Sequence, residues 1–198
     1  MMRSPRVQGL LIAAATALCP AIALGQMVEP VEPQPAAGDL KPGLEVCYMY
    51  ELVRHINEMV ELEASKECAP GEPLTELNSS VGLNNVLTST GRDGVMAKIT
   101  GLIHLDQPGT YAFAFQSNDG VRLEIDDYMV LEDPDVHADQ WSDIGMVHAE
   151  TPGWVPITIR YFERKNTSTL RFYWQKPGTE GTMPLVPAEA LAHLGSTS

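Results

Sequence analysis

Short runs of alternating apolar and polar residues, separated by turn dipeptides, limit what this sequence can fold into more than any other feature. Apolar side chains recur at every second position in five runs, at residues 95–99, 111–115, 121–125, 155–161 and 170–174. A period of two puts alternate side chains on opposite faces of a strand, so each run predicts a strand with one buried face. Pro-Gly and Asp-Gly pairs between the runs predict turns. We therefore expect an all-β chain, an antiparallel sandwich or barrel.

One segment departs from that period. Between Leu52 and Lys66 the apolar residues, among them Leu52, Ile56 and Met59, fall at helical spacing. This pattern predicts a short helix, although apolar runs of this length also fit strands.

The N-terminal residues predict export. Arg3 and Arg6 precede an apolar run at 7–18 that is too short for a membrane anchor, and the small residues Ala23 and Gly25 suit a cleavage site. We expect a signal peptide at 1–25, cut before Gln26, and a secreted, periplasmic or cell-surface protein with no membrane insertion after cleavage. A retained anchor is the alternative, and a lipoprotein is disfavoured because bulky Leu18 precedes Cys19.

Proline and glutamate dominate the next residues. Segment 26–42 contains four prolines and no periodic apolar pattern, which predicts a linker. The remaining residues, 43–198, fit a single domain with a core of ordinary size.

The charge of the chain disfavours nucleic acid as a partner. The whole sequence has 13 basic and 26 acidic residues, a formal charge of −13. Removal of residues 1–25 takes two arginines and no acid, which leaves 11 basic residues against 26 acidic ones and a charge of −15. Such a chain repels polynucleotides and anionic lipid, but it can attract divalent cations.

Two cysteines, Cys47 and Cys68, remain after signal cleavage. In an oxidising compartment an even number favours a disulfide, which would stabilise the fold by roughly 3 kcal/mol. Two separate buried thiols are the alternative. No CxxC pair or histidine spacing suggests that these cysteines bind a metal.

Residues 115–127, FQSNDGVRLEIDD, place two alternating runs around Asn118-Asp119-Gly120. An Asp-Gly turn between such runs predicts a β-hairpin, because Gly120 adopts positive φ readily and Asp119 can bond its own backbone. The hairpin needs no ligand, so the question is whether the turn oxygens also bind an ion.

The order of several sequence pieces resembles the fourteen-kilodalton protective-antigen domain family. The pieces are ITGLIHLDQPGTYAFAF, SNDGVRLEIDDYMVL, a variable acidic loop, PGWVPITIRYFE, STLRFYWQKPG and MPLVPAEAL. The resemblance runs from roughly Gly91 to Leu194, and GLEV at 43–46 looks like the family's opening strand. It implies two packed antiparallel sheets in a secreted or surface protein. Members include calcium-dependent glycan binders as well as structural and protein-interaction modules.

The resemblance also implies a calcium site. Glycan-binding members hold calcium with two consecutive aspartates, where this chain has Asn118 and Asp119, and with an oxygen from a following loop. Asp119 matches the second aspartate, whereas Asn118 keeps an oxygen ligand but lacks the charge. Glu163 is the counterpart of the loop oxygen and can restore that charge, and Asn166 is its rival.

The variable acidic loop, EDPDVHADQWSD at 132–143, is a second candidate region. Asp135, His137, Asp139 and Trp141 are its candidate ligand-binding residues, and the Trp141 ring offers a flat face for a pyranose. The loop lacks the glycine and final glutamate of a helix-loop-helix calcium site, so a solvated acidic loop is the simpler interpretation.

The two other tryptophans, Trp154 and Trp174, lie in strand patterns and are expected in the core. HExxH and GxSxG motifs are absent from the sequence, and neither cysteine has a convincing histidine partner. We therefore expect a non-catalytic binding module. Its predicted partner is extracellular or cell-surface carbohydrate, with calcium as the cofactor. The alternative is an envelope module that binds another protein.

Overall fold

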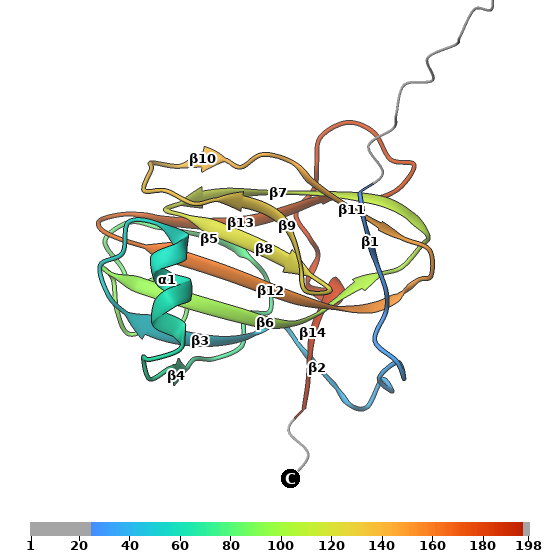
Figure 1. Ribbon diagram of the computed structural model, residues 1–198, viewed down its shortest axis with the longest axis horizontal. Coiled ribbons are helices and arrows are strands. Elements are labelled where there is room, and N and C mark those ends of the chain that lie inside the picture. Colours follow the sequence, from blue (N-terminus) through green and yellow to red (C-terminus); the bar gives the residue numbers. More distant parts are fainter. Residues whose placement is uncertain (1–24, 196–198) are drawn as a thin grey trace, which may run out of the picture.

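Two sheets packed face to face form the computed structural model, which describes residues 25–195 (Figure 1). Sheet A has six strands in the order β1-β11-β7-β13-β5, with β10 also paired to β7. Its strands are β1 (Gln26–Val28), β5 (Asn78–Val81), β7 (Gly109–Asn118), β10 (Gln140–Trp141), β11 (Gly145–Ala149) and β13 (Ser168–Gln175). The expected all-β sandwich is confirmed.

Sheet B has eight strands in the order β2-β14-β6-β12-β8-β9, with β3 paired to β6 and β4 paired to β3. Its strands are β2 (Leu40–Pro42), β3 (Glu45–Tyr50), β4 (Ala69–Pro70), β6 (Val95–Leu105), β8 (Val121–Ile125), β9 (Tyr128–Asp133), β12 (Gly153–Glu163) and β14 (Leu191–Leu194). A short 3₁₀ helix (Ala188–Ala190) precedes β14.

The core lies between the sheets and is built by the alternating residues of the long strands. Phe115 of β7 and Phe172 of β13 are cross-strand partners whose rings lie 4.6 Å apart, and both are fully buried. Trp174 joins this core, as expected. Trp154 does not: it precedes the inward Val155, so its ring lies on the outer face of sheet B, 4.7 Å from the ring of His104.

The turn after β7 differs from the predicted hairpin. Strand β7 belongs to sheet A and β8 to sheet B, so Asn118-Asp119-Gly120 carries the chain from one sheet to the other. The Asn118-Asp119 peptide bond is cis. Gly120 is not among the residues with positive φ; instead, a Cβ at this position would collide with the ring of Phe162. The hairpin joins β8 to β9, where Asp126 and Asp127 adopt φ values of 52° and 61°.

Segment 26–42 lies on the sandwich, although the sequence predicted a linker. Strand β1 runs parallel to β11 at the edge of sheet A and buries Val28, and β2 pairs with β14 in sheet B. Between them, Val31 donates its main-chain amide to the Trp154 carbonyl at 2.9 Å. Proline content lowers strand propensity, but three-residue strands at sheet edges need few free amides. The predicted signal peptide at 1–25 lies outside the described residues except for Gly25.

The predicted helix is confirmed but is shorter, at α1 (Ile56–Glu63). It begins where the His55 side chain accepts a hydrogen bond from the Asn57 amide at 3.1 Å. Ile56 and Met59 pack with Met96 and Phe162 against the outer face of sheet B. After the helix, Cys68 forms a disulfide with Cys47 of β3, with their Cα atoms 5.6 Å apart, as the sequence analysis favoured.

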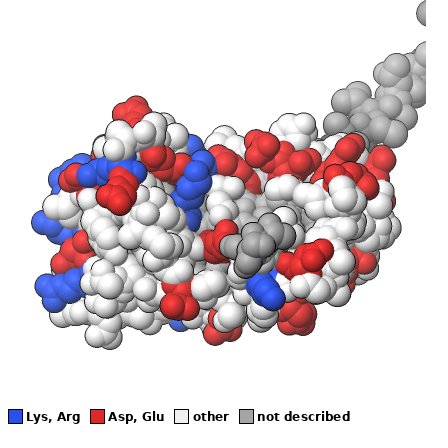
Figure 2. Space-filling model, turned by 90° about the horizontal axis from the view of Figure 1, so that it is seen from below, with Lys and Arg blue, Asp and Glu red and all other residues white. Residues whose placement is uncertain are grey.

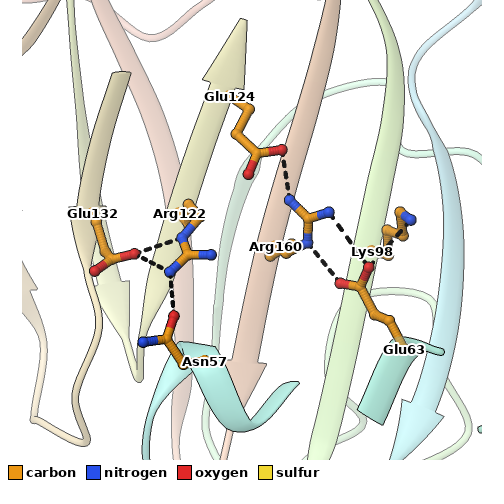
Figure 3. Close-up of polar contacts among 7 residues, drawn as sticks. All are labelled: Asn57, Glu63, Lys98, Arg122, Glu124, Glu132 and Arg160. Carbon is orange, nitrogen blue, oxygen red and sulfur yellow. Dashed lines mark hydrogen bonds and ion pairs between the residues drawn. The ribbon is translucent and has the colours of Figure 1, made fainter. Parts of the chain in front are cut away.

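Charged side chains also hold α1 on sheet B (Figure 3). Glu63, at the end of the helix, accepts from Arg160 Nε at 2.6 Å and pairs with Lys98 at 3.2 Å. Arg160 in turn reaches Glu124 at 2.6 Å. Near the start of the helix, Arg122 pairs with Glu132 and donates to Asn57 Oδ1 at 2.6 Å. Both ends of α1 are therefore tied to strands of sheet B.

The surface charge is unevenly spread. Seen from below the view of Figure 1, lysine and arginine gather toward the end of the molecule that carries α1, whereas aspartate and glutamate dominate the opposite end (Figure 2). In the part of the chain from 25 to 195, no helix is long and apolar enough to span a membrane.

Candidate functional site

The candidate site lies at one end of the sandwich, where strands of both sheets stop. Strand β7 ends at Asn118, β12 ends at Glu163, and β13 begins at Ser168 beside them. These three points lie at the end that also carries α1 (Figure 1). Cross-strand pairing of Asn118 with Thr169 fixes the relation between the turn after β7 and the loop that precedes β13.

Asp119 connects two loops. Its Oδ1 accepts the main-chain amide of His137 at 3.0 Å, and its Oδ2 accepts that of Arg164 at 2.7 Å. The side chain is buried, and this burial raises the pKa of its carboxyl group, although the two amides favour the charged form. Each carboxylate oxygen has a second lone pair, so Asp119 can still ligate a cation.

Glu163 is the most unusual group at this end. It is fully buried, and neither carboxylate oxygen has a hydrogen-bond partner within residues 25–195. Burial, reinforced by the negative charges of Asp93 and Asp119, raises the pKa of Glu163 to about 8, although the nearby main-chain amide of Gly94 opposes the rise. Buried charged groups are ordinarily paired or bound to a metal, so an enclosed carboxyl group without a positively charged partner calls for a counterion or a proton.

Asn118 turns its amide group toward the outer face of sheet A. Its Nδ2 donates to Asp139 Oδ1 and to Thr167 Oγ1, both at 3.1 Å, which leaves Oδ1 as an acceptor. Asp139 also accepts from Thr169 Oγ1 at 2.9 Å, and Thr169 lies 3.2 Å from Ser80 Oγ. These residues line an open pocket of about 480 Å³.

The candidate ligand-binding residues of the acidic loop lie in different surroundings. Asp139 reaches the pocket with Asn118, whereas Asp135 is exposed and its backbone forms a bridge with His55 before α1. The His137 ring is turned into the loop itself, with Nε2 3.2 Å from Asp133 and Nδ1 2.9 Å from the Ala138 carbonyl. Trp141 lies beyond the pocket, on the outer face of sheet A.

Asn166, the rival of Glu163, is exposed. It adopts a φ of 80°, and its main-chain amide donates to Asp93 Oδ1 at 2.9 Å. This contact joins the loop before β13 to the loop before β6. The Asn166 side chain stays exposed and does not enter the buried end of the sandwich. Glu163, by contrast, lies beside Asp119 and feels its charge.

As a metal site, this end offers oxygen ligands only. No group of three or more His, Cys, Asp or Glu side chains in residues 25–195 is arranged to hold a metal ion. Asp119 and Glu163 contribute two carboxylates, and Asn118, the residue before Asp119, keeps its amide oxygen as an acceptor. Calcium accepts this ligand chemistry and takes its remaining oxygens from carbonyls, water or a ligand. The unpartnered oxygens of Glu163 fit such an ion.

The hydroxyl-bearing residues of the pocket are not predicted by the sequence patterns. Ser80, Thr167 and Thr169 lie far from Asn118 in the sequence and reach it only through pairing of β13 with β5 and β7. Thr169 could have been found from the alternation of its strand. It precedes the apolar Leu170, so it is expected on the outer face of the strand.

Fold and loops together define a class of protein: a two-sheet antiparallel sandwich with a polar, acidic site at one end. The sequence model of the PA14 domain matches residues 75–185, more than half of the chain. The chain therefore belongs to the PA14 domain family, as the resemblance predicted. No curated protein matches the sequence.

Solved structures show the same fold. The chain has a TM-score of 0.60 and 16% identity to a PA14 sugar-binding domain from an RTX adhesin, covering 77% of this chain and 98% of that one. For the epithelial adhesin 9 A domain from Candida glabrata, solved with Galβ1-3GlcNAc, the TM-score is 0.64, the identity 12% and the coverage 87% and 98%. An anti-sigma factor domain-containing protein gives 0.64 and 15%, covering 79% of this chain but only 49% of that one. The chain thus spans about half the length of that protein.

Proposed function

We propose that this chain is a carbohydrate-binding module, acting outside the cell, in which a calcium ion at Asp119 and Glu163 completes the sugar site. The observation that carries the proposal is Glu163. Its two enclosed oxygens make no hydrogen bond of ordinary geometry and have no positively charged partner in the described chain, and the negative charge of Asp119 helps to raise the pKa of its carboxyl group. A divalent cation would supply the positive charge that both carboxylates lack.

The open pocket lined by Asn118, the residue before Asp119, suits sugar hydroxyls. It presents an amide (Asn118), a carboxylate (Asp139) and hydroxyl groups (Thr167, Thr169 and Ser80). Sugar hydroxyls donate and accept hydrogen bonds, so a mixed set of donors and acceptors on a rigid sheet end can fix their orientation. A sugar hydroxyl can also serve as a calcium ligand, because calcium takes six to eight oxygens.

Two of the similar structures support the sugar class. One is described as a sugar-binding domain and another was solved with a disaccharide. Their identities to this chain are low, so they support the fold and the class of ligand to be tested, and they do not identify a sugar. Location outside the cell rests on the predicted signal peptide.

A panel of immobilised glycans tests the proposal. The purified protein should be retained on one or a few glycans in millimolar calcium and washed off by chelator, and Asp119→Ala should abolish retention. The matched control is Glu150→Ala, which removes an exposed carboxylate on another loop. If the protein is still retained in chelator, and the Asp119→Ala variant is retained as well, the calcium role is rejected. A panel without any retained glycan would reject the sugar function.

A further inference from the structure

Three loops lie side by side at the end of sheet B that carries α1 (Figure 1). They are the loops after β3 and β12 and the loop before β6. The Gly94 carbonyl accepts the Glu51 amide at 2.9 Å, and the Gly94 amide donates to the Arg164 carbonyl at 3.0 Å. Together they form one continuous surface, which we call the basic surface. It consists of residues 51–54, 92–94 and 164–166.

Positive charge is concentrated on this surface, although the chain as a whole is acidic. Of the 11 basic residues that follow position 25, four lie on it, namely Arg54, Arg92, Arg164 and Lys165. Its acidic residues are Glu51 and Asp93, and Glu51 is paired with Lys66 at 3.0 Å. Figure 2 shows lysine and arginine gathered at the same end. This surface therefore attracts an anionic partner.

Apolar side chains are exposed among these charges. Leu52 is 49% exposed, and its Cδ2 atom lies against Gly94, 3.2 Å from the position that a Cβ would take there. Tyr50, at the end of β3, is 42% exposed. Protein interfaces combine apolar side chains near the centre with polar and charged groups around them. This composition favours a protein partner over a small anion.

The opposite end of the molecule presents a surface of the other sign (Figure 1). The hairpin between β8 and β9 and the segment after β1 meet there, because Glu29 donates its main-chain amide to Asp126 Oδ2 at 3.0 Å. Residues 27–32 and 126–129 form this region, which we call the acidic surface. It has no lysine or arginine, and its acidic residues are Glu29, Glu32, Asp126 and Asp127.

A hollow of about 250 Å³ opens in the acidic surface. Met27, Val28 and Pro30 contribute apolar groups to its lining, and Met27 is 42% exposed. Glu29 and Glu32 line the same hollow and give it negative charge. A cavity of about 150 Å³ holds a benzene ring, so this hollow has room for a leucine side chain.

We propose that the basic surface of one copy of this chain docks on the acidic surface of a second copy, with Leu52 in the hollow beside Met27. The two surfaces have opposite charge, and both expose apolar side chains. Because they lie at opposite ends, each copy keeps one surface free, and the copies assemble head to tail into a chain or a ring. The charge of −15 opposes this contact little at physiological ionic strength, since charges more than about 8 Å apart are screened. The docking requires neither sugar nor calcium.

Sedimentation velocity of the purified protein over a range of concentrations tests the docking. We expect wild type to associate in about 50 mM sodium chloride, and at least about tenfold more weakly in about 0.5 M, where ion pairs are screened. Two charge reversals separate the surfaces: Arg92→Glu with Lys165→Glu, and Glu29→Lys with Glu32→Lys. All four side chains are exposed, so the core is spared.

Each double variant should stay monomeric alone, because its two ends then have charge of the same sign. An equimolar mixture of the two should associate, since it still contains one native basic surface and one native acidic surface. A wild type that stays monomeric in low salt, or a mixture that associates no more than its separate components, overturns the proposal. Wild type that binds heparin or anionic vesicles but not itself assigns the basic surface to another anion and also overturns it.

The apolar part of the contact has its own matched pair of variants. Leu52→Ala should weaken association about tenfold, because it removes the side chain that fills the hollow. Leu194, on β14, is 55% exposed and lies outside both surfaces, so Leu194→Ala should associate like wild type. Equal effects of the two leucine variants would exclude Leu52 from the contact and overturn the docking described.

Discussion

At the scale of single residues, Glu163 has the most consequential environment. Its carboxyl group is enclosed, makes no hydrogen bond of ordinary geometry in the described chain, and has the negative charges of Asp93 and Asp119 nearby. Without a bound cation, the folded protein keeps Glu163 protonated at pH values well above the usual pKa of glutamate. Protonation and stability are therefore coupled through this one group, and the proposed calcium ion would be coupled to both.

The pH dependence of stability follows from this coupling. In chelator, Glu163 has a pKa of about 8 when folded and near 4.5 when unfolded. Between these values the folded state binds the extra proton, so stability is full below about pH 4.5 and falls as pH rises toward 8. The loss is at most about 1.4 kcal/mol per pH unit. Urea unfolding at pH 5, 6.5 and 8 should show wild type losing stability relative to Glu163→Gln. If the unfolding free energies of the two proteins change equally with pH, the Glu163 carboxyl group does not have a raised pKa in the folded protein.

At Asn118 a carboxylate can be added to the site, whereas Glu163→Gln removes one. Asn118→Asp restores the charge that the family resemblance expects, but it replaces the amide donor that Asp139 accepts at 3.1 Å with a second carboxylate. Like charges at that distance repel, so the variant should unfold at a lower temperature than wild type in chelator. In calcium its midpoint should rise by more than that of wild type, because affinity grows with ligand charge. An equal calcium shift in both proteins would exclude position 118 from the ion site.

At the scale of elements, α1 and its disulfide hold the outer side of sheet B. The bond between Cys47 and Cys68 joins residues 21 apart in the sequence and fixes the segment after α1 to β3. Replacing both cysteines by alanine should lower the free energy of unfolding by about 3 kcal/mol, through greater freedom of the unfolded chain. Chemical denaturation of the double variant checks this value. A variant as stable as the oxidised wild type would show that the bond adds nothing to the fold.

The ion pairs of α1 make a separate prediction. Glu63 is mostly buried and contacts both Arg160 and Lys98, so Glu63→Gln leaves Lys98 without its carboxylate and Arg160 with Glu124 alone. We expect a loss of roughly 1–3 kcal/mol in unfolding free energy. Glu61→Gln, exposed on the same helix, is the control and should change little. Equal effects of both variants would mean that the contacts in Figure 3 do not stabilise the helix.

Strands were predictable from the sequence because alternation reports which residues are buried, and every predicted run became a strand. Alternation does not report which sheet a strand joins. For this reason the sequence predicts a hairpin around Asn118-Asp119-Gly120, whereas the segment crosses between the two sheets. The same limit applies to the site. Asn118, Asp119 and Glu163 came from the family resemblance, whereas Thr169 and Ser80 depend on strand register, which one sequence does not reveal.

At the scale of the whole molecule, the sandwich brings loops from both sheets to one end. Asp119 binds the backbone of the acidic loop after β9 and of the loop after β12, so one carboxylate sets the relative position of two loops. The acidic loop is also tied to the start of α1, where Ile56 donates its amide to the Pro134 carbonyl at 2.9 Å. The pocket is thus built on rigid elements, which lowers the entropic cost of binding.

Calorimetric titration of calcium into the purified protein tests whether Asp119 and Glu163 hold a calcium ion. We predict a single site with affinity in the range of extracellular calcium modules, about 10⁻⁴–10⁻³ M. Near pH 7, binding should release a proton as Glu163 ionises, which appears as a heat that depends on the ionisation enthalpy of the buffer. Glu163→Gln should lose the proton release and most of the affinity. Absence of binding at millimolar calcium, or binding unchanged in Glu163→Gln, would mean that Glu163 is not a calcium ligand.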